Sequence, residues 1–132
     1  MVKLPKILID FWVLTENGIV LYSKVSDQKI NPQLFGALMS ALNKFAEKLT
    51  DGGISNFEMS DLRFVIIKRR RFLFIGSSLY KTKEKKVIDD LMLISDQFFK
   101  LYAEALINWD NWDGNLEVFS NFDDYIEHFL GK

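Results

Sequence analysis

The sequence predicts a single α/β domain in which a five-stranded antiparallel sheet carries helices on both of its faces. Two runs of consecutive apolar residues, 64–67 and 72–75, flank a short basic turn. Side chains alternate between the two faces of a strand, so such runs present apolar groups on both faces of a sheet. A sheet of this kind needs a packed layer on each face. Two long segments with helical spacing of apolar residues, 31–49 and 83–106, supply those layers.

The length and composition fit one domain that spans residues 1–132. Hydrophobic residues make up 48% of the chain and charged residues 27%, as in ordinary globular domains. The lack of cysteine excludes a disulfide framework, a thiolate metal site and a cysteine nucleophile. No cleavable leader is visible, and no apolar stretch reaches the ~18 residues that span a bilayer. We therefore expect a cytoplasmic protein that is at most peripheral to a membrane.

A β-hairpin is predicted near the start of the chain. Residues 7–14 and 19–25 carry apolar side chains on both faces, and Asn17-Gly18 between them tolerates the positive φ of a tight turn. Lys24 suits a strand at the edge of a sheet. The half-polar segment 54–60 predicts the other edge strand.

A helix is predicted between these two edge strands. Asn31 is a favourable N-cap, and Pro32 fits the first helical position, where its missing N–H costs nothing. Gly52-Gly53 then offers a left-handed cap at the end. The apolar stripe expected to cover one face of the sheet consists of Leu34, Leu38, Leu42, Phe45 and Leu49.

The second half of the chain predicts a central hairpin over 63–78, a long helix over 83–106 and a short terminal helix over 121–129. Both helices are expected on the face opposite the first helix, which gives the order β-β-α-β-β-β-α-α. The capping candidates are Ser78 or Thr82 for the long helix and Ser120 or Asn121 for the short one. The residues expected to reach the core are Val87, Leu91, Ile94, Phe98, Leu101, Ala105, Leu116, Val118 and Phe119.

This order of elements resembles the longin fold over nearly the whole chain. The basic central hairpin of adaptor small chains is similar to RFVIIKRRRFLFIGSS, their next helix to VIDDLMLISDQFFKLYAEAL, and their terminal helix to FDDYIEHFL. Longin domains also occur in vesicle SNAREs, transport-particle subunits and related archaeal proteins. The roadblock and profilin folds resemble the chain less, because each opens with a helix for which there is no room before Pro5. No SNARE motif follows as far as Lys132, so we do not expect a membrane fusion protein.

The residues that usually carry chemistry are sparse. The one histidine, His128, lies in the predicted terminal helix without a partner for acid–base catalysis. Asp110 and Asp113-Gly114 resemble a calcium loop, but Trp112 occupies a ligand position, so we interpret the segment as a turn. No glycine loop that cradles phosphate is present. We expect no enzyme, no cofactor and no metal.

Binding through the surface remains. The first candidate is the basic hairpin tip, where guanidinium groups recognise carboxylates or phosphates on an anionic partner. A second basic site at Lys81–Lys86 is expected at the opposite end of the same strand, separate from the tip. The residues of the tip are Lys68, Arg69, Arg70 and Arg71, and a further possible interface comprises Ile54, Phe57, Gly36, Ala37, Trp109 and Trp112.

The resemblance implies a role. Longin and roadblock relatives pair through such strand edges, as homodimers or heterodimers, and bind small GTPases. We therefore expect an interaction module that binds a small GTPase or another longin or roadblock subunit in membrane trafficking or GTPase regulation. The alternatives are a peripheral adaptor that uses the basic hairpin on an anionic membrane, and a homodimeric scaffold. A nucleic-acid partner is not expected, because the pI is near 5.8.

Overall fold

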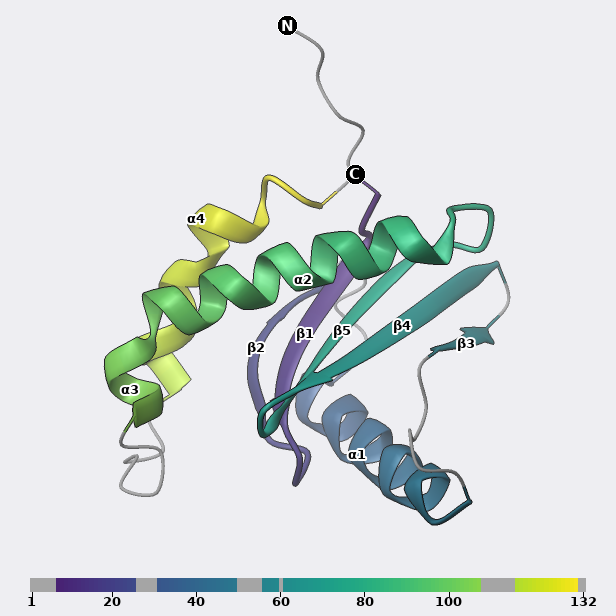
Figure 1. Ribbon diagram of the computed structural model, residues 1–132, viewed down its shortest axis with the longest axis horizontal. Helices are drawn as coiled ribbons and strands as arrows, with labels where there is room; N and C mark the ends of the chain where they lie inside the picture. The colour runs from purple at the N-terminus through teal and green to yellow at the C-terminus, as the bar shows by residue number, and fades with distance from the viewer. Residues whose placement is uncertain (1–6, 26–30, 50–55, 60, 108–115, 131–132) are drawn as a thin grey trace, which may run out of the picture.

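The computed structural model describes residues 7–25, 31–49, 56–59, 61–107 and 116–130. One antiparallel sheet in the order β2-β1-β5-β4-β3 lies between helical layers on its two faces, as predicted (Figure 1). The strands are β1 Asp10–Thr15, β2 Val20–Lys24, β3 Asn56–Met59, β4 Leu62–Arg69 and β5 Phe72–Leu79. The helical segments are α1 Pro32–Leu49, α2 Glu84–Leu101, α3 Ala103–Ile107, η2 Leu116–Phe122 and α4 Asp123–Ile126.

Each face of the sheet has its own core, because neighbouring residues of a strand point to opposite sides. Phe11 and Phe74 belong to the core beneath α2, η2 and α4. Trp12 and Ile75, which follow them in sequence, belong to the core beneath α1. The Trp12 ring stacks on Phe35 of α1 with ring centres 4.2 Å apart. The consecutive apolar residues of the central strands therefore pack alternately against two helical layers, as the sequence predicts.

The β1–β2 turn fixes the position of α1. Gly18 in this turn has a φ of +93°, as expected of Asn-Gly. A Cβ on Gly36 of α1 would lie 2.5 Å from Val20 Cγ2 and 2.7 Å from the Gly18 carbonyl oxygen, so only glycine fits. At the start of the helix, the Asn31 Oδ1 accepts hydrogen bonds from the backbone N–H groups of residues 33 and 34, which confirms the predicted cap.

The predicted apolar stripe of α1 does not cover the sheet. Leu34, Leu38 and Leu42 point to solvent, whereas Phe35 and Met39 contact the core. The close approach at Gly36 turns this other side of the helix inward. The side chains of Phe45 and Leu49 lie outside the described part of the chain.

The second long helix is shorter than predicted, because it breaks at Tyr102. There the ring turns into the core and the hydroxyl donates to Asn121 Oδ1 at 2.6 Å. Leu101, predicted to be buried, is consequently 46% exposed. Neither Ser78 nor Thr82 caps α2, whose N-cap is Lys83 without a side-chain hydrogen bond. The Ser78 hydroxyl instead donates to the carbonyl of Leu79.

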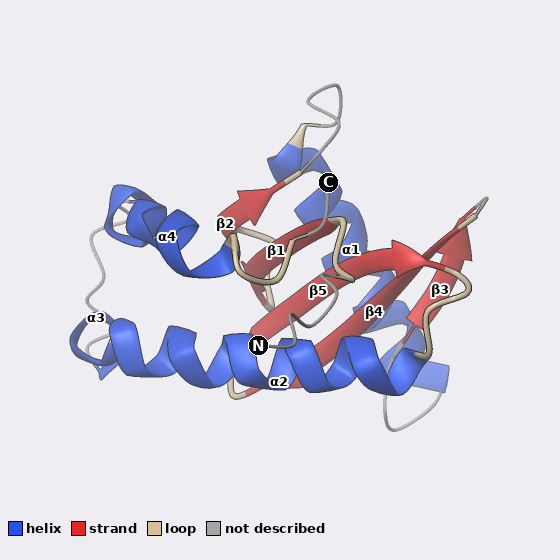
Figure 2. Ribbon diagram, turned by 90° about the horizontal axis from the view of Figure 1, so that it is seen from above, coloured by secondary structure: helices blue, strands red, loops and turns tan. Residues whose placement is uncertain are grey.

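The C-terminal segment is a 3₁₀ turn followed by a short helix, rather than one helix over 121–129. Phe119 is buried as predicted, but Leu116 and Val118 are exposed, since a 3₁₀ helix turns in three residues and presents a narrow inner face. Ser120 and Asn121 do not cap α4, which follows directly from η2. Figure 2 shows this segment beside β2, where the Tyr22 hydroxyl donates to Asp123 Oδ1.

The first strand is shorter than predicted at its start. β1 begins at Asp10, whose N–H donates to Ser77 Oγ at 3.0 Å while the Ser77 hydroxyl donates back to Asp10 Oδ2 at 2.9 Å. Leu8 leaves the ladder and forms a parallel bridge with Leu130. The chain therefore enters and leaves the fold at neighbouring positions.

Candidate interaction surfaces

The outer face of α1 is the first candidate surface, and it consists of Leu34, Ala37, Leu38, Ala41 and Leu42. Their spacing of three and four residues places them in one stripe along the helix. The leucine side chains at 34, 38 and 42 are 71%, 54% and 37% exposed. Apolar patches of this kind on a soluble domain mark sites of interaction.

The edge strand β3 is the second candidate surface. β3 is paired with β4 on one side, and the sheet order ends there. Phe57 stacks on Phe64, with ring centres 4.9 Å apart, and Phe64 in turn lies 6.0 Å from the ring of Phe35 on α1. A strand at the edge of a sheet can pair with a partner strand. The inner side of α1 and the edge strand β3 thus share one aromatic cluster.

The residues proposed from sequence for an interface fall in different places. Ala37 lies on the outer face of α1, and Phe57 is half-buried at the edge strand. Gly36 is buried against Gly18, where it serves the packing of α1 within the chain. Ile54, Trp109 and Trp112 lie outside the described residues.

The basic hairpin tip is held against the rest of the domain. Lys68 Nζ lies 3.2 Å from Glu47 Oε1 and 3.4 Å from Glu16 Oε1, and the hydrogen bond to Glu47 is the main cause that raises the pKa of Lys68. Arg69 donates to Asp96 Oδ1 at 2.5 Å and to Ser95 Oγ at 2.6 Å.

At the end of the tip, the guanidinium of Arg70 lies over the Phe99 ring of α2. Much of the charge at residues 68–70 is therefore engaged within the domain. Recognition of an anionic partner by the tip stays a prediction.

The comparison with known families decides the identity of the fold. The family model described as the first longin domain of FUZ, MON1 and HPS1 matches residues 9–108. The chain belongs to this longin family. Among curated proteins, none matches the sequence.

Solved structures with the same fold share little sequence with this longin domain. MglB from Myxococcus xanthus is similar with a TM-score of 0.58 and 16% identity, over 74% of this chain and 85% of that chain. A Roadblock/LC7 domain from Streptomyces avermitilis gives 0.56 and 13%, over 74% and 87%. The gliding protein MglB from Thermus thermophilus gives 0.53 and 10%, over 62% and 69%. These likenesses confirm a longin/roadblock-like fold, as predicted.

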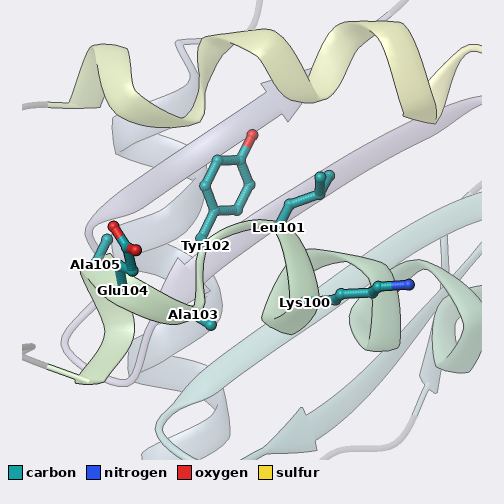
Figure 3. A pocket seen from close by; sticks show the side chains of 6 residues that line it. All are labelled: Lys100, Leu101, Tyr102, Ala103, Glu104 and Ala105. Carbon is teal, nitrogen blue, oxygen red and sulfur yellow. The ribbon is translucent and has the colours of Figure 1, made fainter.

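Two hollows of this longin domain are lined by described residues, and neither gathers a set of reactive groups. One of about 440 Å³ lies at the break between α2 and α3 and is lined by Lys100–Ala105. Figure 3 shows Lys100 and Glu104 pointing away from one another, while Tyr102 points toward the layer of η2 and α4. A second hollow of about 330 Å³ is lined by Arg70, Phe99, Ala103, Leu106 and Ile107.

The chemistry that the described residues offer is surface recognition. Within the described ranges, no cluster of three histidine, aspartate or glutamate side chains is placed to hold a metal ion. No described helix is both long and apolar enough to cross a bilayer. Longin domains are protein-interaction modules, and the family match places this chain among them.

The leucines of the outer face of α1 were missed as surface residues. Their stripe is evident in the sequence, but it was assigned to the core. The signal that would have corrected this is the second apolar set at Phe35 and Met39, which leaves the helix with two apolar sides.

Proposed function

We propose that this longin domain is a non-enzymatic module that pairs with another subunit of longin or roadblock fold, and that the pair binds a small GTPase in membrane trafficking or GTPase regulation. The observation that carries the proposal is the exposed leucine stripe on the outer face of α1, a helix whose inner side shares an aromatic cluster with the edge strand β3. Family membership supports it, because the matched region, residues 9–108, contains both elements.

A partner of the same fold matches this surface in shape and chemistry. Three leucines spaced by four residues form a ridge, which packs into the groove beside the equivalent ridge of a second helix. Full burial of one leucine side chain stabilises an interface by about 1.5–3 kcal/mol, so three half-exposed leucines supply several kcal/mol. A second strand on the β3 edge adds backbone hydrogen bonds. A second copy of this chain satisfies both conditions and gives an interface with two-fold symmetry.

The experiment compares Leu38→Glu with Leu93→Glu. The two leucines are 54% and 56% exposed on different helices, so the second variant is a matched control for the same charge on the other side of the sheet. Analytical ultracentrifugation is run on the chain alone and on its mixture with a roadblock- or longin-type subunit encoded near its gene. We expect association by the wild type and by Leu93→Glu, and loss of association in Leu38→Glu.

The GTPase part of the proposal has its own measurement. Small GTPases encoded near the gene are loaded with GDP or with a non-hydrolysable GTP analogue and tested for retention by the immobilised pair. Retention that depends on the nucleotide supports GTPase binding. Monomeric behaviour of the wild type with every subunit tested, or equal association by both variants, would contradict the assigned surface.

A further inference from the structure

We propose that the turn from the end of β5 into the first turn of α2, residues 79–86, docks on an anionic lipid bilayer. In this assignment Leu79 and Tyr80 enter the headgroup region, and Lys81, Lys83, Lys85 and Lys86 bind the anionic headgroups. This basic site is distinct from the hairpin tip and does not depend on the proposed pairing of subunits.

Two consecutive residues of this turn have large side chains that are about half exposed. Leu79, the last residue of β5, is 51% exposed, and Tyr80 is 48% exposed. Neither belongs to the two core clusters of the domain. Tyrosine favours the membrane–water interface, because its ring is apolar and its hydroxyl remains hydrated. Apolar anchors surrounded by lysines are the usual composition of an interfacial membrane site.

The charges of the four lysines of the turn are available to an external anionic partner. All four are exposed, and none forms an ion pair within the described part of the chain. The acids closest to them in sequence are Glu84, Asp89 and Asp90, and Glu84 Oε1 already accepts a hydrogen bond from Asn56. At the hairpin tip, by contrast, Lys68 and Arg69 are paired with carboxylates. Residues 83–86 span less than one helical turn, so their charges act together within a Debye length of about 8 Å.

Hydrogen bonds hold the backbone of the turn against the rest of the domain. The Thr82 N–H donates to the Leu79 carbonyl at 2.9 Å, and the Tyr80 N–H donates to the Asp61 carbonyl at 3.0 Å. From β4, the Arg63 guanidinium donates to the Thr82 carbonyl at 3.0 Å. Because the backbone is already fixed on both sides, docking does not require the ordering of a loop, which favours binding.

The turn lies away from the outer face of α1, although Glu84 at the start of α2 contacts Asn56 of β3. Figure 1 shows this turn where β5 leads into α2, and it shows α1 on the opposite side of the sheet from α2. The β4–β5 hairpin tip lies at the other end of β5. A domain docked through residues 79–86 would therefore still present the outer face of α1 to a second subunit.

The test measures co-sedimentation with vesicles of phosphatidylcholine alone and of phosphatidylcholine with phosphatidylserine. We expect the wild type to bind only the anionic vesicles and to dissociate in high salt. Each basic residue near an anionic surface contributes about 1 kcal/mol, which is about fivefold in the partition coefficient. Lys81→Gln/Lys85→Gln should therefore lower binding by about 30-fold. Tyr80→Ser should also lower binding to the anionic vesicles. The factor should not change with the salt concentration, because the substitution removes an apolar contact and no charge.

The matched control is Arg70→Gln/Arg71→Gln, which removes the same number of charges from the hairpin tip. We expect it to bind the anionic vesicles like the wild type, with folding verified by circular dichroism. An equal loss in this control would assign the membrane site to the hairpin tip and overturn the proposal. Equal binding to both vesicle types, or retention by an immobilised acidic peptide without any vesicle binding, would overturn it as well.

Discussion

The guanidinium carbon of Arg70 lies 4.3 Å from the centre of the Phe99 ring, so the tip of the β4–β5 hairpin rests on α2. Arg70 reaches this position with a φ of +58°, in the left-handed region that non-glycine residues rarely adopt. The cation–ring contact and the neighbouring pair of Arg69 with Asp96 together connect the central strands to the helix above them.

Substitutions at Arg70 should separate this contact from the backbone strain. Arg70→Ala loses the cation–ring contact, worth about 0.5–1 kcal/mol at an exposed site, and keeps the left-handed backbone. Arg70→Gly loses the same contact but relieves a strain of about 1–2 kcal/mol. We expect Arg70→Ala to be the less stable variant by about 1 kcal/mol in urea unfolding. The reverse order would show that the left-handed turn carries no strain.

The two sides of α1 should respond differently to truncation. Met39 is 2% exposed against the sheet, so Met39→Ala is expected to cost about 2–5 kcal/mol of unfolding free energy. Leu38, the preceding residue, lies on the outer face, and Leu38→Ala should change the stability of the monomer by less than about 0.5 kcal/mol. Chemical denaturation at a concentration that keeps the chain monomeric is the measurement. Similar losses for both would mean that α1 is rotated from its described position.

The contact between α1 and the β1–β2 turn should not tolerate an added methyl group. In Gly36→Ala the new Cβ would meet the Gly18 carbonyl oxygen, a backbone atom that moves only with the turn itself. We expect a loss of about 1–3 kcal/mol, as for overpacked sites. Ala37→Gly, one residue further on the outer face, should cost only the helix propensity of about 1 kcal/mol. A Gly36→Ala variant as stable as the wild type, or more stable as helix propensity alone would make it, would contradict the close approach.

Alkaline titration should report on two buried phenols. Burial, and secondarily the charge of Asp123, raises the pKa of Tyr102 to about 12, and burial with the Asp123 hydrogen bond raises the pKa of Tyr22 further. The folded state therefore holds these protons more tightly than the unfolded state. Stability should be complete below pH 10, the ordinary pKa, and should fall as the pH rises toward 12. Phenolate absorbance of both residues should appear together with unfolding, and earlier ionisation would contradict the burial.

Removal of the charge of Asp90 should stabilise the domain. Burial, with the neighbouring Asp89 charge, raises the pKa of Asp90 above its ordinary 3.8, so the folded state disfavours the charged form. The penalty is present above the folded pKa and absent below 3.8. Asp90→Asn is expected to raise the thermal midpoint modestly at neutral pH and to leave it unchanged in acid. A midpoint that shifts equally at both values would exclude an electrostatic cause.

The sheet was predictable because its signal is local. Consecutive apolar residues at 64–67 and 72–75 require burial on both faces, and a short polar turn leaves few alternatives to a hairpin. The positions of β2 and β3 at the two edges follow from Lys24 and from the half-polar segment around Phe57.

The orientation of the helices was harder to predict. The spacing of apolar residues reveals a stripe along a helix, but it does not show whether that stripe faces the sheet or the solvent. In α1 the stripe of Leu34 and Leu38 is stronger than that of Phe35 and Met39, yet the contact at Gly36 turns the weaker one inward. In α2 the break is at Tyr102, whose hydroxyl donates to Asn121, a residue of the C-terminal segment. Such contacts between distant segments leave no mark in the local sequence.

Leu8 and Leu130 lie in one parallel bridge, and the Leu8 N–H donates to the Phe129 carbonyl at 3.3 Å. A short peptide linking residue 130 to residue 8 would close the chain into a ring without stretching it. New ends could then be opened at a surface turn that makes no contact with α1, which would make this domain amenable to circular permutation. The same adjacency would allow the domain to be inserted whole into a surface loop of a host protein.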